Sequence, residues 1–151
     1  MAATISHDLA WEVTKGHSAT LVKRANGVQF SRDPLNLRNV YSRKNEGQIA
    51  NKAIGVVSSE NGGVTLLVKK ADRHHQPATS TQSTTFGASK GSRKIYSAIV
   101  NSTTKRGYRP DLRKDAVARA SAIRKAGKPV KASPAAKLRG AKAQKATEAS
   151  A

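Results

Sequence analysis

Few side chains in this sequence are suited to catalysis, and their spacing does not bring them together. The histidines are His7, His17, His74 and His75, and the nine acidic residues are scattered singly along the chain. General acid–base and nucleophilic catalysis each need two or three such groups within hydrogen-bonding distance. The sequence shows no paired carboxylates, no Ser-His-Asp pattern and no glycine-rich phosphate loop, so we predict no catalytic residues.

Metal binding is also disfavoured, although two of the histidines are adjacent. The chain has no cysteine, which excludes a disulfide framework and a thiolate zinc site. Adjacent residues in an extended segment point to opposite faces, and no third ligand lies near His74 and His75 in the sequence. We therefore expect no metal site, and we interpret His74 as a polar residue close to phosphate in a basic loop.

The chemistry that the sequence does carry is cationic. Lys and Arg number 28 against 9 Asp and Glu, a formal net charge of +19. Residues 105–145 hold 14 basic and 2 acidic residues, whereas residues 1–74 hold 11 basic and 6 acidic ones. Such a charge attracts a polyanion, and each cation set against phosphate releases counterions. The candidate RNA-binding residues are Lys23, Arg24, Arg32, Arg43, Lys44, Lys69, Lys70, Arg73, His74, Arg93, Lys94, Lys105, Arg106, Tyr108, Arg109, Arg113, Lys114, Arg119, Arg124, Lys125, Lys128 and Lys131.

An anionic membrane is the other polyanion to consider, and the sequence argues against it. No apolar run approaches the roughly 20 residues that a spanning helix needs. The first residues lack the basic start and long apolar stretch of a secretory signal, so we expect a cytosolic or nuclear protein. Aromatic residues make up 4% of the chain, which predicts a thin aliphatic core that gains from a charge-neutralising partner.

The expected mode of RNA recognition is contact with shape and backbone. Modules that read single-stranded RNA display aromatic residues on neighbouring strands or a Gly-X-X-Gly clamp, and the sequence shows neither. We expect Tyr96 in the core. Tyr108 lies between Arg106 and Arg109, where stacking on a base and simple packing both fit.

Turn residues and alternation predict a small α+β core built from two antiparallel hairpins. Runs at 19–24 and 28–32 flank an Asn-Gly pair, which is the strongest short-range hairpin signal. Runs at 53–58 and 64–70 flank a turn rich in Asn and Gly, residues that tolerate positive φ. These four strands are preceded by a short helix at residues 6–15.

Apolar spacing predicts which helix faces pack. In the N-terminal helix Ile5, Leu9 and Val13 recur every four residues, and Trp11 lies off that stripe at an edge of the core. Two further helices are expected, from 92 to 106 and from 110 to 127. Their apolar positions are Ile95, Tyr96, Ile99 and Val100 in the first, and Leu112, Ala116, Ala120 and Ile123 in the second.

The chain thus divides into four parts. We expect an α+β core in residues 1–75, an extended loop at 76–91, two basic helices at 92–127 and a basic tail rich in Ala and Lys at 128–151. Such a tail cannot bury enough apolar surface to offset its ordering entropy. We expect it to be disordered alone, with a part that can become helical once its charges are neutralised.

Several strings of the sequence are distinctive. They are Ser18-Ala-Thr-Leu-Val-Lys-Arg24, Asp33-Pro-Leu-Asn-Leu37, Lys52-Ala-Ile-Gly-Val-Val57 and Pro77-Ala-Thr79. The most specific string is Tyr108-Arg-Pro-Asp-Leu-Arg113, which continues through Arg119-Ala-Ser-Ala-Ile123 to Lys128-Pro-Val130. Together they span about residues 9–130, and they resemble the eukaryotic ribosomal protein large-subunit twenty-eight family.

This resemblance implies a structural protein of the cytoplasmic 60S ribosomal subunit in eukaryotic translation, without enzymatic activity or a cofactor. The implied partners are large-subunit rRNA and neighbouring 60S ribosomal proteins, with no membrane and no small-molecule substrate. Assembly in the nucleolus is implied as well. The tail after Lys131 departs from the animal members, because it is rich in Ala where theirs are denser in Lys and Arg.

Two other classes fit part of the sequence. Residues 125–134 are similar to the tails of linker-histone-type chromatin proteins, but that class places three helices before a hairpin, and here the hairpins come first. A small basic ribonuclease would need paired acid–base groups, which we do not find. For the ribosomal class we expect Arg113 and Arg119, on the flanks of the last helix, to face RNA, and segment 105–145 to cross rRNA as an electrostatic strap.

Overall fold

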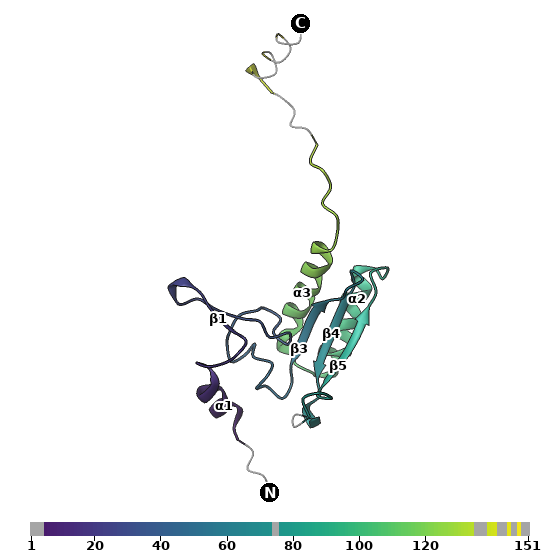
Figure 1. Ribbon diagram of the computed structural model, residues 1–151. Coiled ribbons are helices and arrows are strands. Elements are labelled where there is room, and N and C mark those ends of the chain that lie inside the picture. Colours follow the sequence, from purple (N-terminus) through teal and green to yellow (C-terminus); the bar gives the residue numbers. More distant parts are fainter. Residues whose placement is uncertain (1–4, 74–75, 135–138, 142–144, 146–147, 149–151) are drawn as a thin grey trace.

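A three-stranded antiparallel sheet forms one layer of the core (Figure 1). The computed structural model describes residues 5–73, 76–134, 139–141, 145 and 148. Strands β3 (Ile54–Ser58), β4 (Val64–Lys69) and β5 (Thr81–Phe86) lie in the order β3-β4-β5. The register places apolar residues of the three strands on one face, because paired residues project to the same side.

Two helices cover this apolar face. In Figure 1, α2 (Ser92–Ser102) lies behind the sheet, and α3 (Arg113–Ala126) lies beside β3. Ile95 and Ile99 of α2 and Ala116 and Ala120 of α3 are buried in the same cluster as the strand residues. The two alanines let α3 approach the sheet closely, since only a methyl group separates the backbones. The stripes predicted for both helices are therefore confirmed.

The opposite face of the sheet is partly covered by the loop between residues 31 and 50. A Cβ at Gly55 would lie 2.3 Å from the carbonyl oxygen of Pro34, so β3 needs glycine there to let the loop pass. From this face of β4, the Lys69 ammonium donates to the carbonyl oxygens of Gly47 (3.0 Å) and Gln48 (2.6 Å). The loop is thus attached to the sheet at both strands.

The N-terminal elements stand apart from this sheet. Strands β1 (Leu21–Lys23) and β2 (Gln29–Ser31) form a separate two-stranded sheet. Their turn has positive φ at Asn26 (60°) and Gly27 (72°), as the Asn-Gly signal predicts. Helix α1 (His7–Thr14) begins at Ser6, whose hydroxyl accepts from the backbone N–H of Asp8.

The α+β class is confirmed, but the sheet differs from the predicted one in two ways. The two hairpins do not share a sheet, and β5 is a strand where the sequence predicted a loop. Its sequence, Thr-Gln-Ser-Thr-Thr-Phe, lacks the apolar alternation by which strands are recognised. As the edge strand next to β4 it keeps most side chains in solvent, and its threonines favour extended backbone.

Helix α1 is oriented differently from the prediction. Trp11 packs on Tyr41, with ring centroids 5.0 Å apart. The stripe of Ile5, Leu9 and Val13 is exposed, by 69%, 58% and 69%. Helix α1 therefore packs through Trp11 and not through the four-residue stripe, and the side chains of Asn51 and Arg43 bond to its His7 and Asp8.

Two short 3-10 turns, Thr104–Arg106 and Pro110–Leu112, join α2 to α3 around Gly107, which has φ of 72°. Beyond Gly127 the described residues of the tail run outward from the core and are exposed (Figure 1). The predicted helical part of the tail lies mostly outside the described residues. Within the described part of the chain, no helix is long and apolar enough to cross a membrane.

Candidate nucleic-acid interface

The described residues contain no cluster of three His, Cys, Asp or Glu side chains that would hold a metal ion. The structure also divides the predicted RNA-binding residues into those that hold the fold together and those that remain on the surface. Of this set, His74 lies outside the described residues.

Lys69 is an internal residue and not a surface cation. It is 9% exposed, and its ammonium is directed to the carbonyl oxygens of Gly47 and Gln48. Two buried carboxylates accompany it, those of Asp33 and Glu46. Asp33 accepts from the backbone N–H groups of Leu35 and Gly47, each at 3.0 Å. Lys69 therefore compensates buried charge, and we remove it from the RNA-binding set.

Burial shapes the protonation of this cluster. Burial raises the pKa of Glu46, the nearby charge of Asp33 raises it further, and a backbone hydrogen bond from Gln48 and the charge of Lys69 lower it. Burial lowers the pKa of Lys69, and the two carboxylates oppose that shift. Oε2 of Glu46 is buried and has no hydrogen-bond partner among the described residues, which is consistent with the raised pKa.

Tyr108 packs inside the fold. Its hydroxyl accepts from the backbone N–H of Ala53 (3.0 Å) and donates to the carbonyl oxygen of Lys69. The Lys52 ammonium lies 5.9 Å from the centroid of the ring. Burial raises the pKa of Tyr108, partly offset by the Ala53 hydrogen bond and the charge of Arg109. Of the two readings left open by the sequence, the structure shows packing.

Arg109 joins three segments of the chain. Its guanidinium donates to both carboxylate oxygens of Asp111 (3.0 and 2.9 Å) and to the carbonyl oxygens of Lys52 (2.9 Å) and Lys44 (3.1 Å). The hydrogen bond and the charge of Arg109 lower the pKa of Asp111, and partial burial opposes this. The Tyr-Arg-Pro-Asp-Leu-Arg string, which carries the family resemblance, therefore has a largely structural role. We call an arginine that bonds separate segments of the fold together in this way a latch.

Three further arginines of the predicted set also hold elements in place. Arg43 donates to Asp8 of α1 at 2.9 Å. Arg124 donates to the carbonyl oxygens of Ala88 (2.9 Å) and Lys90 (3.3 Å), which ties α3 to the segment before α2. Arg119 is the third, and its half-buried side chain faces the loop that follows β2.

The Asn39 amide positions Arg119. When the Asn39 nitrogen donates to the carbonyl oxygen of Asn36 (3.2 Å), its oxygen accepts from Nη1 of Arg119 (3.2 Å). Nε of Arg119 is buried without a partner among the described residues. Arg119 on the flank of α3 therefore also packs against the loop after β2, and exchanging it for Glu would disturb this packing.

The remaining predicted cations are exposed or half-exposed, and they are spread over every part of the fold. They lie at the first hairpin, around β4 and its following turn, at the start of α2, between α2 and α3, on α3 and in the tail. These surface cations are Lys23, Arg24, Arg32, Lys44, Lys70, Arg73, Arg93, Lys94, Lys105, Arg106, Arg113, Lys114, Lys125, Lys128 and Lys131. Exposed Arg38, Lys52 and Lys90 share this character, and only their isolation in sequence kept them out of the prediction.

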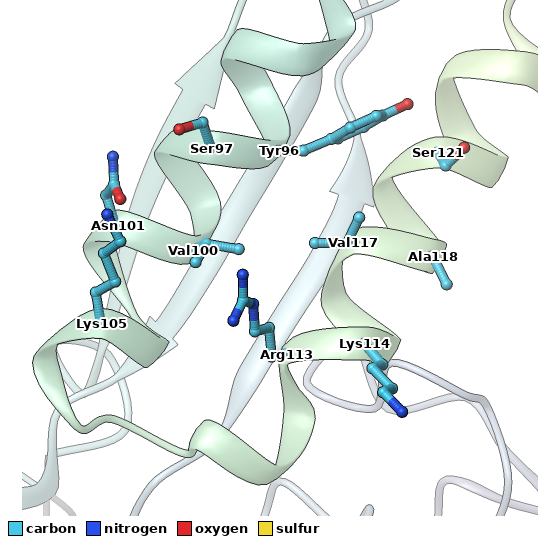
Figure 2. A pocket seen from close by; sticks show the side chains of 10 residues that line it. All are labelled: Tyr96, Ser97, Val100, Asn101, Lys105, Arg113, Lys114, Val117, Ala118 and Ser121. Atoms are coloured by element: carbon cyan, nitrogen blue, oxygen red, sulfur yellow. The ribbon is translucent and has the colours of Figure 1, made fainter.

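A groove between α2 and α3 collects cations and apolar side chains on the outer side of the helix pair (Figure 2). Its volume is about 930 Å³. Figure 2 shows Val100 and Val117 facing each other across it, with Arg113 reaching into the gap between the helices. The groove could not be recognised from the sequence, because Tyr96 and Val100 fit the buried stripe of α2 and Val117 lies off the stripe of α3.

The described part of the chain is a small basic α+β fold whose cations divide into those that bond within the fold and a dispersed surface set. Residues 9–126 match the ribosomal L28e protein family. The large ribosomal subunit protein eL28 of Schizosaccharomyces pombe is 35% identical over 130 residues, which cover 85% of this chain and 97% of that protein. The protein of the same name from Dictyostelium discoideum is 33% identical over 122 residues, 81% of this chain and 89% of that one. The chain belongs to the ribosomal L28e protein family and is a ribosomal protein rather than an enzyme.

Proposed function

We propose that the chain is a structural constituent of the large ribosomal subunit in eukaryotic translation and that it binds rRNA through its surface cations. Both relatives described above are named as large-subunit proteins. The proposed partners are large-subunit rRNA and neighbouring ribosomal proteins. The proposed location is the cytoplasmic 60S subunit, after assembly in the nucleolus.

The observation that carries the rRNA proposal is the dispersion of the surface cations. They extend from Lys23 in the first hairpin to Lys131 in the tail, so every part of the fold carries exposed cations. Nine acids stand against 28 Lys and Arg in the sequence. Of the described acids, Asp33 and Glu46 are buried, and Asp8, Glu12 and Asp111 are paired with Arg43, Lys15 and Arg109. A protein surrounded by RNA on several sides would need such a distribution, because phosphate contacts position a protein without reading its sequence.

The proposed binding mode is contact with phosphates and RNA shape. Exposed Arg side chains can bridge phosphate oxygens bidentately, whereas Lys acts as a point charge. Segment 105–145 supplies both kinds, and we propose that its exposed cations, such as Lys105, Arg113 and Lys128, act as a strap across rRNA. Within the same segment the half-buried Arg109, Arg119 and Arg124 bond to other parts of the fold instead, as the buried Lys69 does from β4.

Sedimentation of cell lysate through a sucrose gradient tests the subunit assignment. The tagged chain should migrate with 60S subunits, 80S ribosomes and polysomes. Ribonuclease, which cuts the mRNA between ribosomes, should move it out of the polysome fractions together with the ribosomes. If it stays in the nuclear pellet and deoxyribonuclease releases it, the chromatin class is correct instead.

A further inference from the structure

We propose that the groove between α2 and α3 binds an unpaired RNA nucleotide, with a base on its apolar floor and a phosphate at its basic end. This inference rests on the proposed rRNA-binding function and adds a base-binding site to it. The sequence predicted contacts with shape and backbone alone. The groove departs from that expectation because its lining is not only cationic.

The floor of the groove is apolar. Val100 of α2 and Val117 of α3 face each other, Ala118 lies next to Val117 on the same turn, and Tyr96 leans from α2 toward α3 (Figure 2). The phosphate and ribose edge of an RNA duplex would leave this floor without an apolar partner. A nucleobase supplies one, because both of its faces are flat and apolar, and stacking on an aromatic ring accepts any base.

One end of the groove is positively charged. Lys105 follows α2 and Arg113 begins α3, and Figure 2 shows the Arg113 guanidinium directed into the gap. No acidic residue is among the described residues that line it. Unlike the latch arginines, Arg113 has an exposed side chain. This arrangement complements a phosphate group next to the stacked base.

The walls carry groups that match the edge of a base. Ser97 and Asn101 of α2 and Ser121 of α3 border the floor. Hydroxyl and amide groups both donate and accept, as the Watson–Crick edges of bases require. The volume of about 930 Å³ lies within the range of about 300–1,000 Å³ of small-ligand pockets, so a nucleotide fits.

The nucleotide must be unpaired. In an A-form duplex the bases are stacked inside the helix, and proteins reach mainly phosphates and 2′-hydroxyls. Only a loop, bulge or strand end can place a base between α2 and α3. Exposed Arg106 follows the lining residue Lys105, and exposed Lys125 lies four residues after the lining residue Ser121, so both can hold the flanking backbone.

Binding of the full-length chain to two probes, an eight-nucleotide single-stranded oligouridylate and a 16-base-pair RNA duplex, tests this site. Stacking of one base on an aromatic ring changes affinity by about five- to a hundred-fold. Tyr96→Leu should weaken single-strand binding at least about fivefold and leave duplex binding unchanged. Tyr96→Phe, which keeps the ring, is the matched control and should bind both probes like the wild type.

A second measurement does not depend on how the variants fold. The single-stranded probe should shift the methyl NMR signals of Val100 and Val117 in the wild-type chain, and the duplex should not. If both probes bind but these methyl signals stay fixed, or Tyr96→Leu binds the single strand normally, the groove is not a base site and the rRNA proposal still stands. If an acidic apolar peptide shifts the methyl signals and RNA does not, the groove is a protein site. Failure of both RNA probes and of rRNA to bind would overturn the proposed function as well.

Discussion

At the scale of single residues, the main result is that identical side chains have different roles. Arg109 and Arg113 are four residues apart, yet Arg109 is bonded to backbone carbonyls and Arg113 is exposed at a groove. The carbonyl partners of Arg109 belong to Lys44 and Lys52, far away in the sequence. Composition predicted that the chain is cationic but could not separate the two roles, because only the fold brings donors and acceptors together.

Removing the Arg109 side chain should destabilise the fold. Arg109→Ala leaves two carbonyl oxygens and the Asp111 carboxylate without their donor, and breaking such bonds costs about 1–3 kcal/mol of unfolding free energy. Urea unfolding followed by circular dichroism measures the change. Arg106→Ala, at an exposed position, is the matched control and should alter stability by less than about 0.5 kcal/mol. Equal effects of the two changes would contradict the latch.

Glu46 should make stability depend on pH. Its pKa is raised above the ordinary value of 4.5, so the folded chain binds more protons than the unfolded chain between that value and the raised one. The contribution of Glu46 to the free energy of unfolding is therefore fully present below pH 4.5, and it is lost as pH rises through the raised pKa. Asp33 opposes ionisation of Glu46, and Lys69 favours it.

Comparing Glu46→Gln with the wild type from pH 4 to 8 checks this dependence. The variant should show a flatter profile of unfolding free energy against pH than the wild type. Glu12→Gln changes an exposed carboxylate and is the control, with a profile like that of the wild type. A Glu46→Gln profile parallel to that of the wild type would show that Glu46 titrates normally.

At the scale of elements, apolar periodicity predicted the helices that pack against the sheet, and it failed for elements that bury few apolar side chains. The stripes of α2 and α3 are correct because those helices bury them against the sheet. The strand β5 was missed because its polar edge position demands no apolar alternation. The stripe of α1 was misread because that helix is held by the contact of Trp11 with Tyr41 and by the bonds of His7 and Asp8, none of which belongs to the stripe.

The packing of α1 predicts that Trp11 contributes more to stability than Leu9 of the apolar stripe. Trp11→Ala should lower the unfolding free energy by about 1–3 kcal/mol, since it removes a large partly buried ring that contacts Tyr41. Leu9→Ala, at a position 58% exposed, should cost less than about 0.5 kcal/mol. Thermal unfolding of both variants measures the difference, and a larger loss for Leu9→Ala would mean that the stripe is packed.

At the scale of the whole molecule, the fold explains why basic charge is dispersed. Buried residues of the sheet, α2 and α3 make one small core, and internal arginines attach the outlying segments to it. The remaining cations therefore point outward from all parts of the chain. The sequence predicted the class, most elements and the charge; it missed the groove, because residues of two helices meet there only after packing.

Truncation after Gly127 separates folding from binding. The described tail residues 128–134 are exposed, so the shortened chain should unfold at the same urea midpoint as the full chain. It should enter 60S subunits less well in a cell that expresses both forms, because the strap loses its tail cations. Equal incorporation, measured by gradient sedimentation, would show that the tail does not contribute.

The most direct test of the account is the salt dependence of binding to purified large-subunit rRNA. Replacing Lys23, Arg24, Arg93 and Lys94 with Gln removes exposed cations from two distant parts of the surface without touching a latch. The logarithm of affinity should fall less steeply with the logarithm of salt, by about 0.7–0.9 for each lost phosphate contact, while the urea midpoint stays constant. An unchanged affinity and slope in this folded variant would contradict the claim that dispersed surface cations bind rRNA.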